Sequence, residues 1–124
     1  MHIVHHAHLR CERNHGEHRL VAACREQGIA GFVVWMSTLE PGAATREMRH
    51  DGELVAVAHA GAGKLLLDGG PQRFQSPCSL LIPPGCSFHV ANNGGAPLHL
   101  FWVCTRPPRP VDDAIPTAPE ESAP

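Results

Sequence analysis

Histidine is the residue type in this chain best suited to chemistry near neutral pH. The sequence contains ten histidines, a single lysine (Lys64) and no tyrosine. Imidazole titrates close to neutrality and is the commonest metal ligand in proteins, so this composition raises the hypothesis of a metal site. Six of the ten histidines lie within the first 18 residues: His2, His5, His6, His8, His15 and His18. The spacing of these six would suit zinc or nickel, although histidine-rich termini are more often solvated and poorly ordered.

The cysteines form no recognisable metal or redox motif. Their number is odd, and no pair has the two-residue separation of a C-x-x-C motif; they are Cys11, Cys24, Cys78, Cys86 and Cys104. The first residues lack the apolar region of a secretion signal. We therefore expect reduced thiols and a cytoplasmic location.

Length and charge exclude several classes of protein. The 124 residues, 43% of them hydrophobic, are enough for one domain with a core. No apolar run approaches the roughly 20 residues of a membrane span, so no membrane association is expected. Residues 1–105 carry eight basic and eight acidic side chains, since two of the ten basic and four of the twelve acidic residues follow Thr105. A neutral body has no electrostatic footprint for nucleic acid.

The chain ends in a proline-rich stretch. Residues 106–124 hold six of the twelve prolines and almost no large apolar side chain. Such a segment buries too little surface to offset its ordering entropy. We therefore expect residues 106–124 to form a disordered tail.

The body of the sequence predicts β-structure throughout. Short runs rich in apolar and β-branched residues alternate with Gly, Pro and Asn turns, at residues 32–39, 53–59, 64–68, 79–82, 87–91 and 97–104. This spacing is typical of an antiparallel sandwich or barrel. One segment, His18–Gly28, fits a helix ending at Gly28 and fits a strand nearly as well.

Two segments between Phe32 and Val103 resemble the motifs of the cupin superfamily, the small jelly-roll β-barrels. Residues 41–70 read PGAATREMRHDGELVAVAHAGAGKLLLDGG, with the Pro-Gly start, the histidine region and the closing glycine of the first motif. Residues 82–103 read IPPGCSFHVANNGGAPLHLFWV, with the Pro-x-Gly and asparagine of the second. The chain is similar to the ligand-sensing cupin domain of arabinose-type transcription regulators. The resemblance implies an all-β, single-domain cupin jelly-roll barrel.

The resemblance also implies a division of the chain and a partner. Residues 29–105 would form the cupin barrel, and the histidine-rich residues 1–28 would pack on that barrel or swap with a second one. Small jelly rolls expose strand edges that can pair with another chain. Together with the family resemblance, this predicts a homodimer.

The metal site of the family needs three histidines and one carboxylate, and most of these positions are changed here. Met48 stands at the first histidine position, and His50 stands at the second. Strict spacing places Leu54 at the glutamate position and Phe88 at the last histidine position. Glu53 lies one residue before Leu54, and His89 lies one residue after Phe88. A one-residue offset in a strand turns a side chain to the opposite face. Only a β-bulge would bring them back inside.

Two functions follow from this reading. The first is a small-molecule-binding cupin with a degenerate metal site and no cofactor, whose ligand pocket is lined by Trp35, Met48, His50, Glu53, Phe88 and Trp102. The second is a metal-dependent enzyme of dioxygenase, isomerase or cyclase type. It would hold one divalent ion (Zn, Fe, Ni or Mn) on a shifted site of His50, Glu53 and His89. The identity of the small molecule is not encoded in any motif.

Overall fold

The computed structural model describes residues 3–68 and 70–111, which form two antiparallel β-sheets. The six strands of the first sheet, sheet A, are, in spatial order, β1 (Glu12–Asn14), β2 (Glu17–Ala23), β3 (Val33–Leu39), β10 (Leu98–Cys104), β5 (Leu54–Ala60) and β8 (Cys78–Ile82). The five strands of sheet B are β11 (Arg109–Pro110), β4 (Met48–Arg49), β9 (Ser87–Ala91), β6 (Ala62–Leu67) and β7 (Gly70–Gln75). Two short 3₁₀ turns, η1 (His6–His8) and η2 (Arg25–Gln27), complete the described elements.

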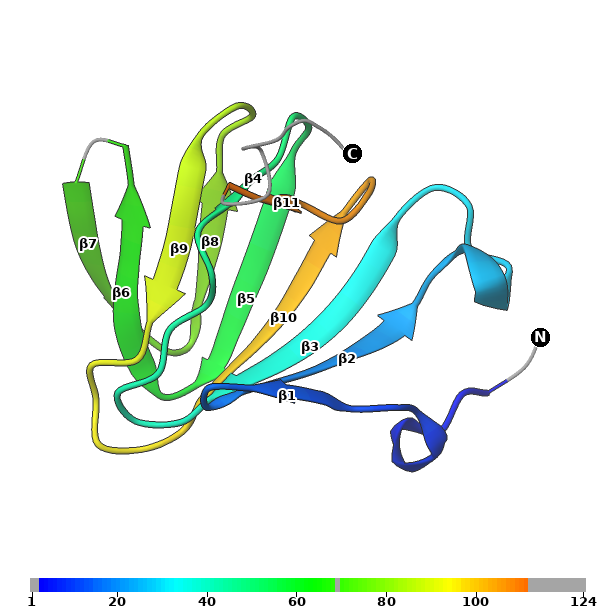
Figure 1. Cartoon of the computed structure of the whole chain (residues 1–124), viewed down its shortest axis with the longest axis horizontal. Helices are drawn as coiled ribbons and strands as arrows, with labels where there is room; N and C mark the ends of the chain where they lie inside the picture. Colours follow the sequence, from blue (N-terminus) through cyan, green and yellow to red (C-terminus); the bar gives the residue numbers. More distant parts are fainter. Residues whose placement is uncertain (1–2, 69, 112–124) are drawn as a thin grey trace.

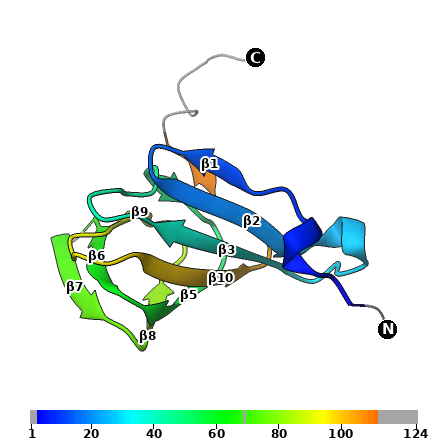
Figure 2. The ribbon, with the colours of Figure 1, turned by 90° about the horizontal axis from the view of Figure 1, so that it is seen from below.

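The two sheets face each other as an open sandwich. In Figure 1 the strands of sheet B lie near β5 and β8, whereas β2 and β1 extend sheet A away from them. Figure 2 shows the same arrangement from below, with β6 and β7 at one end and η1 and η2 at the other. The expected jelly roll is therefore confirmed, but its sheets do not close into a barrel. On one side sheet B ends in β4 and the edge strand β11, each only two residues long, so they leave β1 and β2 without a facing strand.

The core lies between the sheets because the central strands alternate strictly. Along β3 and β10 every second side chain is buried, beginning with the first residue of each strand. This period of two places Trp35 and Trp102 on the inner face of neighbouring strands, where they are register partners. The alternation predicted from sequence thus positions the aromatic part of the core.

Six strands were predicted from the sequence, and the structure confirms them within two residues at each end. The strands β1, β4, β7 and β11 were not predicted. They are either two or three residues long or, like β7, polar and proline-containing, and so carry no apolar pattern. The helical alternative for His18–Gly28 is wrong: β2 runs through it and η2 follows, ending at Gly28 with a φ of 93°.

The two ends of the domain both join the sheets. Residues of the amino-terminal segment form β1 and β2, which extend the chain's own sheet A beside β3. The expected tail begins at Arg106, yet β11 pairs with β4, and the Val111 N–H donates to the Glu47 carbonyl at 2.9 Å. Residues 112–124, the rest of that tail, lie outside the described residues. Neither 3₁₀ turn of the described chain has the length and apolar character of a membrane-crossing helix.

Candidate functional site

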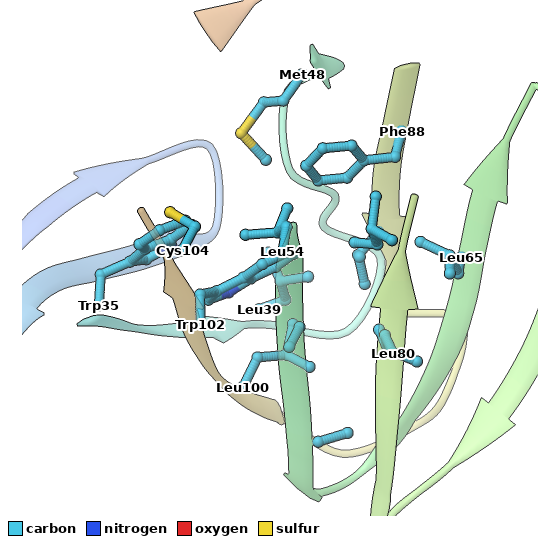
Figure 3. Packing of buried hydrophobic residues seen from close by; sticks show 14 of the residues in the cluster. Trp35, Leu39, Met48, Leu54, Leu65, Leu80, Phe88, Leu100, Trp102 and Cys104 are labelled. Atoms are coloured by element: carbon cyan, nitrogen blue, oxygen red, sulfur yellow. The ribbon is translucent and has the colours of Figure 1, made fainter. Parts of the chain in front are cut away.

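The three apolar side chains at the motif's metal positions lie together in the core. Met48 and Phe88 are register partners across β4 and β9, and Leu54 begins β5 in the facing sheet. Their exposed fractions are 6%, 0% and 2%. Figure 3 shows Met48 and Phe88 above Leu54, within one cluster of buried side chains. Thioether and hydrocarbon groups packed in this way leave a dry interior.

The two tryptophans of the predicted pocket belong to the same cluster. Trp35 and Trp102 stack with ring centroids 5.4 Å apart and planes 5° from parallel. The ring centroid of Phe88 lies 6.1 Å from that of Trp102. The Trp102 Nε1–H donates to the Ser37 hydroxyl at 2.9 Å. The structure therefore brings Trp35, Met48, Phe88 and Trp102 together, as mutually packed core rather than as the walls of a cavity (Figure 3).

His50 is buried, and backbone groups occupy both of its ring nitrogens. Its exposed fraction is 3%. The Gly52 N–H donates to Nδ1 at 3.1 Å, with the Gly52 carbonyl oxygen 2.8 Å from the same nitrogen. Nε2–H donates to the Arg106 carbonyl at 2.7 Å. A metal ligand needs a ring nitrogen with a lone pair aimed at the ion, and here neither nitrogen is available for one.

The Arg106 carbonyl also accepts a second hydrogen bond, from the Cys104 thiol at 2.7 Å. Burial raises the pKa of Cys104 to about 11, against smaller opposing effects of that hydrogen bond and of Arg19. The thiol is therefore protonated at neutral pH, which makes it a donor and not a nucleophile. Together His50 and Cys104 fix the chain just before β11, so their role in this arrangement is structural.

Glu53 and His89 lie apart from this interior. Glu53 is exposed in the loop before β5, whereas the next residue, Leu54, points inward. His89 is half-buried between Phe88 and Val90, both fully buried, so it points to the outer face of sheet B. The register irregularities of the described ladders fall near β2 and near the start of β10, so no bulge turns either side chain inward.

The shifted set of His50, Glu53 and His89 is therefore not assembled. Among residues 3–68 and 70–111 no three histidine, cysteine, aspartate or glutamate side chains form a group able to hold a metal ion. The side chains at the motif positions also disfavour a metal, because Leu54 and Phe88 supply no ligand atom and Met48 supplies only a weak one. The side chains at these positions do not fit the metal site that the resemblance implies.

A different set of polar residues lines the inner face of sheet A, at its open end. Glu17, Arg19 and Val21 on β2 are register partners of the inward residues of β3, so they too face inward. The Arg19 guanidinium lies over the Trp35 ring, 4.8 Å from its centroid. A guanidinium over an aromatic ring is attracted to the ring face, and its N–H groups remain donors for a ligand.

Arg19 lines a pocket of about 270 Å³ at this open end, which we call the mouth. Its wall comes from β1, β2 and η2, and includes Arg10, Glu12, Arg19, Val21, Glu26 and Gln27. No described carboxylate lies within 4.0 Å of the Arg19 guanidinium, even though Glu12 is its register partner on β1. The mouth therefore offers charged groups of both signs, one of which is the guanidinium that covers the Trp35 ring.

Glu17 lies two residues before Arg19 on β2 and faces the same side, although it does not line the pocket. Burial raises the pKa of its carboxyl, and the charges of Arg19 and Arg46 oppose that rise only in part. A half-buried carboxyl with a raised pKa beside a ligand pocket is the kind of group that functional sites use.

Sequence reasoning missed Glu17 and Arg19. The signal was present in the alternation of Glu17, Arg19 and Val21, but it becomes readable only if the segment is a strand. The helical alternative would place these residues on unrelated faces. Which face of β2 turns inward then depends on its register with β3.

Comparison with known families identifies the domain. Residues 35–104 match the family profile described as a cupin domain. No curated protein sequence matches the chain.

Solved structures of cupins share the fold at low sequence identity. The polyketide cyclase RemF from Streptomyces resistomycificus is 21% identical with a TM-score of 0.73, over 90% of this chain and 85% of that one. A predicted oxalate decarboxylase from Thermotoga maritima is 17% identical with a TM-score of 0.73, over 82% and 96%. An RmlC-like cupin from Shewanella frigidimarina is 14% identical with a TM-score of 0.69, over 92% and 95%. At these identities the likeness shows the fold alone.

Proposed function

The chain belongs to the cupin family, and we propose that it is a small-molecule-binding member that uses the mouth of its sandwich instead of an interior metal. One observation carries the proposal: the Arg19 guanidinium lies 4.8 Å over the Trp35 ring and lines the 270 Å³ pocket, with no described carboxylate paired to it. The interior at the former metal positions is filled by Met48, Leu54 and Phe88. A ligand therefore has room at the mouth and not in the core.

The size and charge of the mouth indicate the class of ligand. Its volume is just below the roughly 300 Å³ at which ligand pockets begin, which suits a molecule with one ring. The planar fork of Arg19 binds a carboxylate in two parallel hydrogen bonds. Glu12 and Glu26 on the same wall disfavour anions of higher charge. We therefore infer an aromatic or cyclic monocarboxylate.

A ligand-sensing role would use the same mouth. A cupin domain that senses its ligand must change a neighbouring segment when the ligand binds. Here the pocket lies between β1, β2 and η2, all at the amino-terminal end of the domain. A bound carboxylate would order β1, β2 and η2, and this change would report the ligand without any catalysis.

The test uses benzoate as the probe, with the full chain, by isothermal titration calorimetry. We expect benzoate to bind and the neutral analogue benzyl alcohol to bind at least about tenfold more weakly, because a charge-assisted hydrogen bond contributes about 1.5–3 kcal/mol. Arg19→Gln should weaken benzoate binding by a similar factor. The matched control is Arg13→Gln, which removes an arginine on the outer face of the adjacent strand, opposite His18.

Two results would overturn the proposal. One is that Arg19→Gln and Arg13→Gln bind benzoate equally well. The other is that the natural chain binds one equivalent of a divalent metal whose removal by chelator abolishes benzoate binding. The second result would favour the metal-dependent enzyme.

A further inference from the structure

A second pocket lies beside the two short strands β4 and β11, at one edge of sheet B. Its volume is about 180 Å³. None of its residues lines the mouth, and in Figure 1 β4 and β11 lie apart from η1 and η2. We call it the arginine pocket, and it is lined by Arg49, His50, Asp51, Arg106, Pro107 and Arg109.

Positive charge exceeds negative charge in the arginine pocket. Three of the lining residues are arginines, and one is an aspartate, Asp51, which pairs with Arg109 at 3.2 Å. The Arg49 guanidinium donates to the neutral hydroxyl of Ser87 at 3.1 Å. Within the described part of the chain, no carboxylate lies within 4.0 Å of the guanidinium of Arg49 or Arg106. The arginines and the aspartate together leave an excess of two positive charges.

The fold brings two of these arginines together. Arg49 and Arg109 are register partners across β4 and β11, so their side chains start from the same face of sheet B. This is the outer face, because Met48, the preceding residue of β4, is buried in the core. Like charges directly opposite each other in a sheet are destabilising. Asp51 compensates one of the two charges, and a bound anion would compensate the other.

Buried groups fix the backbone that carries the third arginine. The Arg106 carbonyl accepts hydrogen bonds from His50 Nε2–H and from the Cys104 thiol, both at 2.7 Å. His50 is itself held by the Gly85 N–H, which donates to the His50 carbonyl at 2.7 Å. Pro107 follows Arg106 and restricts the backbone further. A site whose backbone is fixed before binding loses less conformational freedom when the ligand arrives.

The charge and size of the arginine pocket indicate a phosphate group. A phosphate monoester carries about −1.5 to −2 charges at neutral pH and three strong acceptor oxygens. Several guanidinium groups can donate to these oxygens in bidentate pairs, whereas a carboxylate is satisfied by a single fork. A volume of about 180 Å³ suits a phosphate group with few other atoms, because pockets for whole ligands begin near roughly 300 Å³.

We propose that the arginine pocket is a second ligand site, which binds a phosphate dianion through Arg49, Arg106 and Arg109. Inorganic phosphate and the phosphate group of a small ester present this same chemistry, and the test separates the two sources. The inference does not depend on the proposed function, because the arginine pocket and the mouth have no residue in common.

The test is isothermal titration calorimetry of the full chain at pH 8 and low ionic strength, with methyl phosphate and dimethyl phosphate as probes. Dimethyl phosphate has the same tetrahedral centre but carries one negative charge less. We expect methyl phosphate to bind at least about tenfold more tightly, because the dianion accepts more charge-assisted hydrogen bonds. Inorganic phosphate is titrated in parallel. If it binds at least as tightly as methyl phosphate, the ligand is the free ion; if it binds more weakly, the ligand is an ester.

Two variants remove one guanidinium each. Arg49→Gln and Arg106→Gln should each weaken the binding of methyl phosphate by at least about tenfold. Arg106→Gln keeps the backbone carbonyl that accepts from His50, so the fold is retained. The matched control is Arg73→Gln, because Arg73 lies on the outer face of the same sheet, also opposite a cation, Lys64, but outside the arginine pocket.

Asp51→Asn tests the charge balance in the opposite direction. It removes the one carboxylate of the arginine pocket and should strengthen methyl phosphate binding by about two- to fivefold, as expected for an exposed charge. Far-ultraviolet circular dichroism establishes which variants are folded.

The proposal is wrong if methyl phosphate and inorganic phosphate bind no more tightly than dimethyl phosphate. It is also wrong if every folded variant of Arg49 and Arg106 binds methyl phosphate as well as Arg73→Gln does, or if Asp51→Asn binds it more weakly than the natural chain. Benzoate binding at Arg19 should be the same in Arg49→Gln as in the natural chain, so the two sites are tested separately.

Discussion

The interior and the mouth of this sandwich are built from different strands. Within the core, β3 and β10 contribute Trp35 and Trp102, stacked on each other, and Phe88 lies beside Trp102. At the mouth, β1, β2 and η2 form the wall of a pocket of about 270 Å³, and Arg19 of β2 both lines this pocket and lies over the Trp35 ring. The core contains hydrocarbon where its family has metal ligands, whereas the mouth contains the charges.

Under the proposed function, this difference places the ligand site away from the positions where the family binds its metal. An ion in the interior would hold its substrate by direct coordination. When Met48, Leu54 and Phe88 replace the ligands, that volume becomes part of the packing that stabilises the fold. Recognition then has to come from side chains at the uncovered end of sheet A, where β2 extends beyond sheet B.

The largest expected effect comes from the interior. Phe88→Ala removes a fully buried ring and leaves a cavity beside Trp102, so the free energy of unfolding should fall by about 3–5 kcal/mol. Urea denaturation followed by tryptophan fluorescence measures it. The control is Phe32→Ala, because Phe32 is 45% exposed and should lose far less. Equal losses for the two variants would contradict a tightly packed interior.

The second prediction concerns His50. His50→Ala removes the donor to the Arg106 carbonyl and leaves the Gly52 N–H without its acceptor, which should cost about 1–3 kcal/mol of stability. His89→Ala, on the outer face of sheet B, should cost less than about 0.5 kcal/mol. Thermal unfolding with and without EDTA completes the experiment. A structural His50 predicts the same melting temperature in both, and a large drop in EDTA for the natural chain alone would make His50 a metal ligand.

The third and smallest effect concerns Glu17, two residues before Arg19 on β2. Because burial raises its pKa in the folded state, the folded chain binds the proton more tightly than the unfolded chain does. The stability associated with this proton is present below the unfolded pKa and is lost as pH rises through the raised folded pKa. Glu17→Gln should therefore raise the urea midpoint at pH 7, with a smaller difference from the natural chain at pH 4.

The control for this prediction is Glu53→Gln, which removes an exposed carboxylate outside the sheets. Because the Glu53 side chain is exposed, Glu53→Gln should change the midpoint at pH 7 less than Glu17→Gln does. If Glu17→Gln lowered the midpoint at pH 7, the attraction to Arg19 and Arg46 would outweigh the cost of burial.

Much of the interior could be predicted from the sequence, because strand periodicity determines it. Once residues 53–59 and 87–91 are read as strands, Leu54 and Phe88 must face one way and Glu53 and His89 another. The role of His50 could not be predicted in this way. Its partner is a backbone carbonyl 56 residues away, in a segment whose composition predicts a disordered tail.

The mouth was beyond sequence reasoning for a different reason. Arg19 belongs to a segment whose apolar pattern fits helix and strand about equally, and its contact with Trp35 depends on the register of β2 with β3. The pocket also needs η2 and the residues before β1, which have no periodic pattern. Local sequence encodes neither the register nor this packing.

The most direct test of the central claim uses the two tryptophans as separate reporters of mouth and core. The chain contains only Trp35 and Trp102, so a ¹⁵N–¹H correlation spectrum has two indole signals, which Trp35→Phe assigns. Titration with benzoate should shift the signal of Trp35, which lies beneath Arg19, more than that of Trp102, which no mouth residue covers. A shift of the Trp102 signal as large as that of Trp35 would place the ligand in the interior and contradict the account.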